Sequence, residues 1–352
     1  MKIKRLTYVS REVGKIGAEA IAALGKRAAK ANSAIGVTGV LIYSGGIFYQ
    51  VIEGPEEKID SLFERISQDK RHSDVSCIEV EADLDERRYP DWSMRSINLD
   101  VESAQMLQPI RELLSTLTKS REVLAQYTQP SVVRLLGKGV DPLCCKAVKV
   151  RKIILFSDIM GFNHLASNLD AARTLELVNI FLSTASEIVA GHGGIVTKLI
   201  GDCLMANFSA NQADDAIRAG MEILSEIEKV RKDASPKSAL RALHCGVGLD
   251  SGVVVEGNIG CRIKKDFTII GEAANHAAWI ESLTRHKSHL LLFSKSVKEL
   301  LTEKWSLVEL GNCKLKHGQD DITLFSVDEP LAKNPAGPGE ISRQIERIVS
   351  HP

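Results

Sequence analysis

The 352-residue sequence has no apolar run as long as the roughly 20 residues that a membrane-spanning helix needs. Its first residues, Met-Lys-Ile-Lys-Arg-Leu-Thr-Tyr, also lack the apolar core of a signal peptide. We therefore expect a cytoplasmic protein that does not enter a membrane.

An excess of charge of either sign is also missing. The chain has 45 basic and 45 acidic residues, so no electrostatic footprint favours nucleic acid or an anionic membrane surface. The seven cysteines are odd in number and show no Cys-x-x-Cys spacing, which argues against a disulfide framework and a zinc site. Partners must therefore be inferred from the candidate sites.

Two common phosphate-binding signatures are absent as well. There is no Gly-x-x-x-x-Gly-Lys-Ser/Thr loop, and the run Gly246, Gly248 and Gly252 places its third glycine one position late for a dinucleotide fingerprint. We interpret this run as a turn between two strands. Any nucleotide chemistry must be organised in another way.

What is present is two successive α+β patterns joined by a helical segment. The first pattern predicts strands at 4–10, 37–44, 47–53, 75–82 and 92–97, and helices at 17–31 and 55–68. The second pattern predicts strands at 152–158, 195–200, 203–208, 241–249, 252–258 and 321–327, and helices at 170–190, at 211–232 and from 271. Between them, residues 103–136 are helical in pattern, with breaks at Pro109 and Pro130. We expect domains at 1–100 and 151–328, a helical linker at 101–150 and a tail at 329–352.

Tyr8 lies on the first predicted strand and Gln50 on the third, so a phenol and an amide can meet over the first sheet. Taken alone, these are ordinary strand residues. They occur in order with Asn32, Val-Thr-Gly-Val-Leu at 37–41, Asp-x-Arg-His at 69–72 and Trp-Ser-Met at 92–94. Over roughly residues 4–98 the sequence resembles the BLUF family of flavin-binding blue-light sensors, which implies a ferredoxin-like domain.

The resemblance implies FAD (or FMN) held between the two helices, with Tyr8 and Gln50 coupled to the flavin ring by hydrogen bonds and Trp92 or Met94 nearby. Because glutamine has both donor and acceptor groups, its rotation or tautomerisation rewires this network after light absorption. The positions that match the family's contacts to the ring, ribityl and phosphate groups are Asn32, Arg65, Asp69, Arg71 and His72. The alternative, a flavin redox enzyme, lacks a dinucleotide fingerprint to support it.

In the second pattern, Asp158 ends a strand that is expected to be buried, and Asp202 lies between two other strands. Acidic residues at turns are usually turn formers. Two such carboxylates near a phosphate are, however, the ligands that Mg²⁺ takes, and paired ions can activate a hydroxyl and stabilise a leaving phosphate.

Four motifs extend this observation: Phe-Ser-Asp-Ile-x-Gly-Phe at 156–162, Thr-Lys-x-Ile-Gly-Asp at 197–202, Gly-x-Ala-x-Asn at 271–275 and Leu-Lys-x-Gly at 315–318. Together they resemble the catalytic domain of class III nucleotidyl cyclases over about 152–327. A BLUF domain followed by this domain resembles the photoactivated adenylyl cyclases over nearly the whole chain.

The resemblance assigns a role to each matching position. Asp158, the carbonyl of Ile159 and Asp202 would hold two Mg²⁺ or Mn²⁺ ions; Lys198 and Thr268 would read the base, Asn275 would orient the ribose, and Lys316 would hold the polyphosphate. Lysine is a pure donor and suits adenine N1, an acceptor, so ATP is the expected substrate. In this family the metal carboxylates come from one chain and the base-reading residues and the asparagine from the other. This implies a homodimer whose rotations open or close the site.

Two positions of the cyclase motifs depart from the family pattern. Trp279 stands four residues after Asn275, where the family has an arginine that stabilises phosphate charge in the transition state. An indole cannot supply a charged bidentate donor. Glu272 also replaces the usual aspartate, and we interpret Arg285, further along, as a surface or structural residue. Two hypotheses follow: a light-regulated adenylyl cyclase of reduced rate, which we favour because the other motif residues are present, or a light-switched pseudo-cyclase that binds nucleotide or a partner without turnover.

Overall fold

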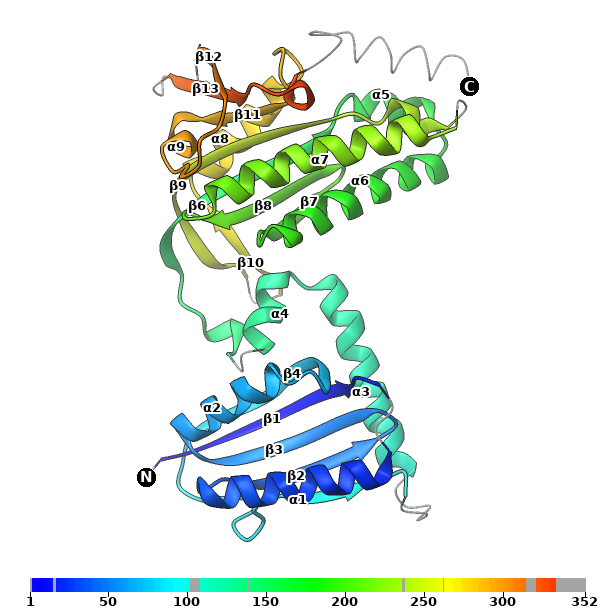
Figure 1. Ribbon diagram of the computed structural model, residues 1–352, viewed down its shortest axis with the longest axis vertical. Helices are drawn as coiled ribbons and strands as arrows, with labels where there is room; N and C mark the ends of the chain where they lie inside the picture. The colour runs from blue at the N-terminus through cyan, green and yellow to red at the C-terminus, as the bar shows by residue number, and fades with distance from the viewer. Residues whose placement is uncertain are drawn as a thin grey trace. The chain divides into compact units, whose positions relative to one another are not determined.

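The computed structural model describes residues 2–14, 17–101, 108–137, 140–235, 238–261, 263–314 and 321–333. The chain forms two compact units, Met1–Cys145 and Lys146–Pro352, and each is described by itself. Both units combine helices with a sheet, which confirms the α+β class (Figure 1). Among the residues described, no helix is long and apolar enough to cross a membrane.

The first unit is built on a five-stranded sheet with the strand order β4-β1-β3-β2-β5 (Figure 1). Its elements are β1 (Ile3–Glu12), α1 (Ala18–Ala34), β2 (Thr38–Ser44), β3 (Ile47–Pro55), α2 (Glu56–Ser67), β4 (His72–Leu84) and β5 (Arg95–Asn98). The elements predicted for this segment are therefore all present, with ends shifted by a few residues. Gly45 and Gly46 turn β2 into β3 with positive φ angles of 54° and 83°, which glycine adopts without strain.

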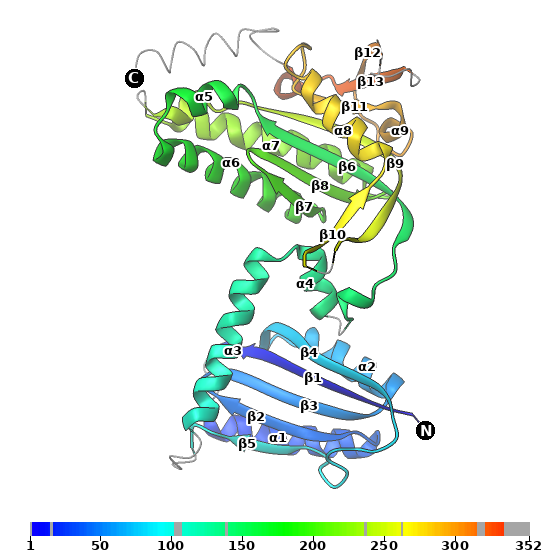
Figure 2. The same ribbon diagram turned by 180° about the vertical axis from the view of Figure 1, so that it is seen from behind.

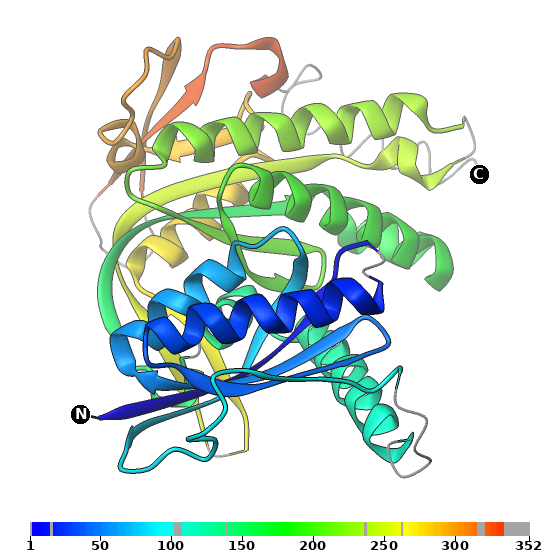
Figure 3. The ribbon, with the colours of Figure 1, turned by 60° about the horizontal axis from the view of Figure 1, so that its bottom comes forward.

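Both helices of this sheet lie on one face. Ile21 of α1 and Ile59 of α2 belong to the same buried cluster as Tyr8 and Phe48 of the sheet. Figure 3 shows α1, in dark blue, lying along the strands. In the antiparallel pairing of β1 with β3, Tyr8 is directly opposite Gln50, so the register itself brings the predicted phenol and amide together.

Two further helices complete this unit, α3 (Gln108–Tyr127) and α4 (Pro130–Gly137). Pro130 is the first residue of α4, a position where a missing backbone N–H costs nothing. Leu114 and Thr118 are buried on α3. Arg11 of β1 forms an ion pair with Glu122 of α3, which joins this helix to the sheet.

The second unit has an eight-stranded sheet with the order β12-β13-β11-β9-β6-β8-β7, and β10 pairs with β9 off this path. Its strands are β6 (Val148–Ile159), β7 (Ile195–Ile200), β8 (Cys203–Ser209), β9 (Cys245–Gly260), β10 (Lys265–Ile270), β11 (Leu291–Ser294), β12 (Leu307–Cys313) and β13 (Ile322–Val327). Its helices are α5 (Phe162–Asn168), α6 (Ala171–Gly191), α7 (Ala213–Asp233), α8 (Glu272–Leu283) and α9 (Lys295–Lys298). The strands β11 and β12 and the helices α5 and α9 were not predicted.

Side chains alternate across this sheet and divide its surroundings into two layers. Ile153 and Leu155 of β6 pack into the core formed with α6 and α7. Ile154, between them, packs instead against Ala273 and Ala277 of α8. Figure 2 shows α8 crossing the strands β6 and β9 on the face away from α6 and α7.

The prediction of two strands at 241–249 and 252–258, separated by a glycine turn, is wrong. Residues 245–260 form the single strand β9. The glycines are needed for close packing: a Cβ at Gly248 would lie 2.2 Å from the backbone nitrogen of Glu281, and one at Gly252 would lie 3.0 Å from the Cβ of Ala273. These two glycines let α8 lie directly on the strand.

Candidate functional site

A cavity of about 360 Å³ lies in the first unit, lined by residues of α1, α2 and the sheet. Seven of the predicted flavin-site residues line it: Tyr8, Asn32, Gln50, Arg65, Asp69, Arg71 and His72. The cavity is within the size range of cofactor sites. The fold thus brings to one cavity residues that are spread over more than 60 positions in the sequence.

Tyr8, Gln50 and Met94 form a chain of contacts beside this cavity. The Tyr8 hydroxyl donates to Gln50 Oε1, and Gln50 Nε2 donates to Met94 Sδ at 3.4 Å. Burial raises the pKa of Tyr8 above its usual range, so its hydroxyl keeps its proton and acts as the donor. The orientation of the Gln50 amide therefore follows from its two partners: the Tyr8 hydroxyl is the donor to Oε1, and the Met94 sulfur is a weak acceptor for Nε2.

Of the two residues expected near the glutamine, the structure brings only Met94 into contact. Trp92 stacks on Tyr89, with ring centroids 5.1 Å apart, and the Arg95 guanidinium lies 5.0 Å from the Trp92 ring centroid. Trp92 does not belong to the set of described residues that line the cavity.

The polar lining fits a flavin nucleotide. Asn32 is 3% exposed, and its Nδ2 has no hydrogen-bond partner among the described residues, so a donor is left for a ligand carbonyl. Arg65 supplies a cation suited to a phosphate group, and so does Arg27 of α1, which the sequence analysis missed. The available signal was a basic residue on the predicted helix 17–31, five positions before Asn32.

The remaining three predicted residues are fixed by local contacts. Arg71 pairs with Asp69 through its Nε and Nη2, and this pairing lowers the pKa of Asp69 to about 2. His72 Nδ1 lies 2.8 Å from Ser10 Oγ, which holds the imidazole against β1. Asp69 therefore remains ionised, and its charge orients Arg71.

In the second unit, the sheet register brings Asp158 and Asp202 together. Asp158 of β6 is opposite Cys203 of β8, the residue that follows Asp202. Burial, followed by the hydrogen bond and charge of Asp158, raises the pKa of Asp202 to about 7. Asp202 therefore resists ionisation beside Asp158 unless a cation is present.

This donor set fits a divalent metal ion. Carboxylate and carbonyl oxygens are the ligands that Mg²⁺ takes. Asp158 Oδ1 accepts a hydrogen bond from the Ile159 backbone nitrogen at 3.0 Å, which fixes that carboxylate at the start of the turn after β6. The sequence analysis expected Asp158, Asp202 and the Ile159 carbonyl to hold two ions, and they are the residues that would hold them here.

The sequence analysis assigned no role at this site to two of its groups, Glu281 and Arg285. Glu281 of α8 is 4% exposed, and burial, followed by the charge of Asp158 and opposed by Arg285, raises its pKa to about 7. Arg285 Nη2 lies 2.6 Å from Asp158 Oδ2, and its Nη1 lies 3.0 Å from Glu281 Oε2. The sequence analysis interpreted Arg285 as a surface or structural residue, and the structure places it in direct contact with a proposed metal ligand. Its contact with Asp158 joins residues 127 positions apart, so no pattern among neighbouring residues of the sequence could have predicted it.

The predicted base-reading residues lie on β7 and β10. Lys198 Nζ is 3.6 Å from Asp266 Oδ2, and Thr268 is two residues further along the same strand as Asp266. Because residues two apart share a face of a strand, Lys198 and Thr268 border the same surface. Thr268 is buried.

Asn275 is exposed on α8, whereas Trp279 packs with Leu310, Cys313 and Ile322 around a core of Ile280, Leu292 and Leu324. The indole therefore covers the cluster through which α8 packs on β11 and β13. Lys316, the last of the predicted site residues, lies outside the described residues.

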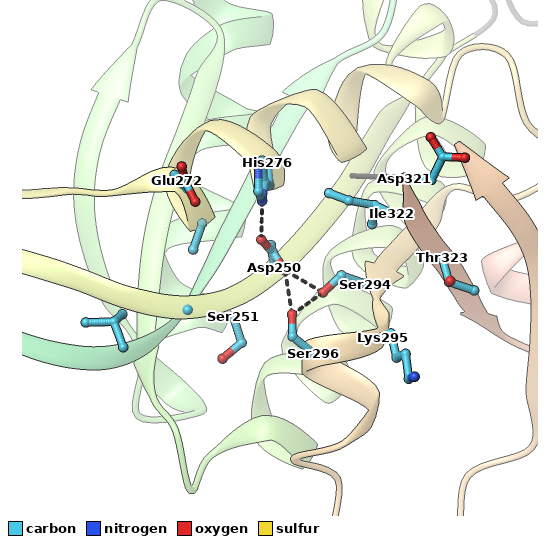
Figure 4. Close-up of a pocket in the computed structure, with 13 residues that line it drawn as sticks. Asp250, Ser251, Glu272, His276, Ser294, Lys295, Ser296, Asp321, Ile322 and Thr323 are labelled. Carbon is cyan, nitrogen blue, oxygen red and sulfur yellow. Dashed lines mark hydrogen bonds and ion pairs between the residues drawn. The ribbon is translucent and has the colours of Figure 1, made fainter. Parts of the chain in front are cut away.

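A second cavity, of about 330 Å³, lies beside α8 and contains a closed polar network (Figure 4). Asp250, 4% exposed, accepts hydrogen bonds from Ser294 Oγ and from Ser296 Oγ at 2.7 Å, and its Oδ2 lies 3.1 Å from His276 Nδ1. These contacts join α8 to β9 and to the β11–α9 segment. They hold the helix that presents Asn275.

Two family comparisons agree with these sites. Residues 3–95 match the family of sensors of blue-light using FAD, called BLUF. Residues 149–329 match the adenylate and guanylate cyclase catalytic domain.

Individual proteins similar to this chain carry both parts. Photoactivated adenylate cyclase subunit alpha of Euglena gracilis is 32% identical over 331 residues, and subunit beta of Euglena longa is 30% identical over 299 residues. These matches cover 92% and 84% of this chain, but the chain spans only about a third of the length of each Euglena protein. A solved structure of a bacterial light-regulated adenylyl cyclase is similar over 99% of this chain and 100% of its own, with 37% identity and a TM-score of 0.88.

Proposed function

The chain belongs to the light-regulated adenylyl cyclases that join a BLUF sensor domain to a class III cyclase catalytic domain, and we propose that it forms cyclic AMP and pyrophosphate from Mg-ATP under the control of blue light. The observation that carries this proposal is the adjacent carboxylate pair Asp158–Asp202 in a chain that also holds the Tyr8–Gln50 pair. The direct test is cyclic AMP formation from Mg-ATP by the purified protein in the dark and under blue light.

On the sensor side, a flavin held in the cavity would supply light absorption and an electron acceptor. Tyr8 holds its proton at the hydroxyl that donates to Gln50 Oε1, so it can release an electron and a proton together. Gln50 can then rotate or change tautomer, because its amide has both a donor and an acceptor end. The contact of Gln50 Nε2 with Met94 carries this change to the residue just before β5.

Gln50→Leu should keep the bound flavin and lose the light-induced red shift of its absorption, because leucine fills the space but cannot change hydrogen-bond partners. Absorption spectra before and after blue light measure this. Gln68→Leu makes the same substitution at an exposed position of the same unit and should retain the shift. A red shift that survives in Gln50→Leu would remove this amide from the switch.

On the catalytic side, Asp158 and Asp202 would hold the divalent ions that activate the ribose hydroxyl and bind the phosphates. Asn275 would orient the ribose, Lys316 would hold the polyphosphate, and Lys198 with Thr268 would read adenine. The ammonium of Lys198 can donate to adenine N1, whereas guanine N1 carries its own proton.

Lys198→Glu should weaken ATP binding by about tenfold or more, because the new carboxylate faces the acceptor N1 of adenine. Calorimetry with ATP measures the affinity. Lys229→Glu reverses the same charge on an exposed residue of α7 and is the control. Unchanged ATP affinity in Lys198→Glu would place base recognition elsewhere.

The site requires two chains. Along α8, Asn275 and Glu281 are six residues apart, which is about 9 Å of rise and about 240° of rotation. Since Glu281 is on the side of the metal carboxylates of its own chain, Asn275 faces a different direction and is free to complete a partner's site. Helix α3 supports a homodimer, because its exposed Ile110, Leu113, Leu117, Leu124 and Tyr127 follow heptad spacing.

Trp279 indicates a slow enzyme, because it stands where the family has an arginine that stabilises phosphate charge. The removal of one charge donor from a developing phosphate charge costs about 10² to 10³ in rate. The same residue favours the second candidate, a pseudo-cyclase that binds nucleotide without turnover. The two differ in one measurement, since only the slow enzyme forms cyclic AMP above the level of an Asp158→Asn variant.

A further inference from the structure

Arg285 bridges two carboxylates that come from different elements of the second unit. Its Nη2 contacts Asp158 at 2.6 Å, and its Nη1 contacts Glu281 at 3.0 Å. We propose that Arg285 is the internal counter-cation of the metal site: it holds Asp158 while the site has no metal, and a divalent cation binds by displacing it. This inference rests on the proposed function, since it requires that Asp158 and Asp202 bind the metal.

The carboxyl groups that surround Arg285 favour a cation at its position. Asp158, Asp202 and Glu281 bring three carboxyl groups to the end of β6 and the C-terminal end of α8. Like charges at close range repel strongly where water is partly excluded. A guanidinium reaches two carboxylates at once with its planar fork, which an ammonium ion cannot do with the same geometry.

The contacts also show how Arg285 can be released. Oδ1 of Asp158 accepts the Ile159 backbone N–H, and Oδ2 accepts Arg285. A metal that takes Oδ2 therefore competes with one guanidinium nitrogen only. The other nitrogen stays on Glu281, which is four residues earlier, nearly fully buried and in need of a positive partner.

This arrangement makes metal binding a competition. An ion that takes Asp158 Oδ2 must replace a charge-assisted hydrogen bond, and such a bond is roughly worth a tenfold or larger change in an equilibrium constant. Removing Arg285 should therefore tighten metal binding by about tenfold or more, because the same oxygens become available with no competing cation. Arg285 is thus a positioning residue that sets metal affinity.

The experiment measures Mn²⁺ binding to the full-length protein without ATP, by the loss of the free-ion electron paramagnetic resonance signal. Arg285→Gln should bind Mn²⁺ about tenfold more tightly than wild type, and Arg285→Lys should lie between them. Arg173→Gln, which removes an exposed cation of α6, should bind as wild type does. In the absence of metal, Arg285→Gln should melt at a lower temperature, and Mn²⁺ should raise its melting temperature more than that of wild type.

Mn²⁺ binding that is no tighter in either Arg285 variant than in wild type overturns the proposal. Arg285→Lys retains a positive charge near Glu281, so it still gives an answer if Arg285→Gln does not fold. Asp158→Asn tests the premise separately. If it binds Mn²⁺ as wild type does, the metal lies elsewhere and the proposed function has failed, whatever the Arg285 variants show.

Discussion

Mixing Asp158→Asn protomers with Asn275→Ala protomers should restore cyclic AMP formation that neither variant has alone. The first variant loses a metal carboxylate, and the second loses the side chain proposed to orient the ribose. Each homodimer carries the same defect in both of its sites and should fall to about 1% of wild-type activity or less.

In the mixed dimer the defects separate. One site receives both substitutions, and the other receives the intact Asp158 of one chain and the intact Asn275 of the other. If protomers mix at random, half of the dimers are mixed and each has one working site, so the mixture should reach about a quarter of wild-type activity. The measurement is lit-state cyclic AMP formation, with two different affinity tags to show that the protomers exchange.

Two controls give this result its meaning. Each variant should bind flavin and show the light-induced red shift, which shows that the first unit is intact. Exchange of tagged protomers without a return of activity would contradict a site shared between chains. Activity of either homodimer near the wild-type level would remove that residue from the proposed chemistry.

Trp279→Arg should raise kcat by about 10² to 10³, while the KM for Mg-ATP changes little. The new guanidinium would contact the phosphates where charge develops in the transition state, so its effect belongs to the chemical step. The groups proposed to set ATP affinity are Lys198, Lys316 and the metal, and the substitution leaves them in place. Steady-state kinetics under blue light measure both constants.

The structure adds a second expectation for this variant. The indole packs against the buried cluster of Ile280, Leu292 and Leu324, so an arginine gives up part of that apolar contact and lowers stability by about 1–2 kcal/mol. Its aliphatic stem can cover part of the same surface while its charged end extends outward. Trp279→Leu keeps an apolar side chain and adds no charge, so it should remain as slow as wild type. A folded, flavin-loaded and dimeric Trp279→Arg protein that gains no rate would favour the pseudo-cyclase.

Much of the fold and of both sites follows from the sequence alone. The sequence pattern predicted the adjacent strands 37–44 and 47–53, and the motifs around Asp158 and Asp202 marked the end of a strand and the turn between two others. These signals are local, since each lies within one element or one turn. The residues proposed to bind the flavin, the metal and the base were named because their motifs resemble those of the two families.

Contacts between distant segments were decided only by the tertiary structure. The glycines at 248 and 252 were predicted to form a turn, whereas in the structure they lie on β9 and allow α8 to pack directly against it. Arg285 gave no sign of its pairing with Asp158, and Trp279 gave none of its packing against the cluster shared with β11 and β13. Periodicity and turn chemistry report how a residue relates to its neighbours in the chain, whereas these roles depend on which element packs across the sheet and on the charge that it brings there.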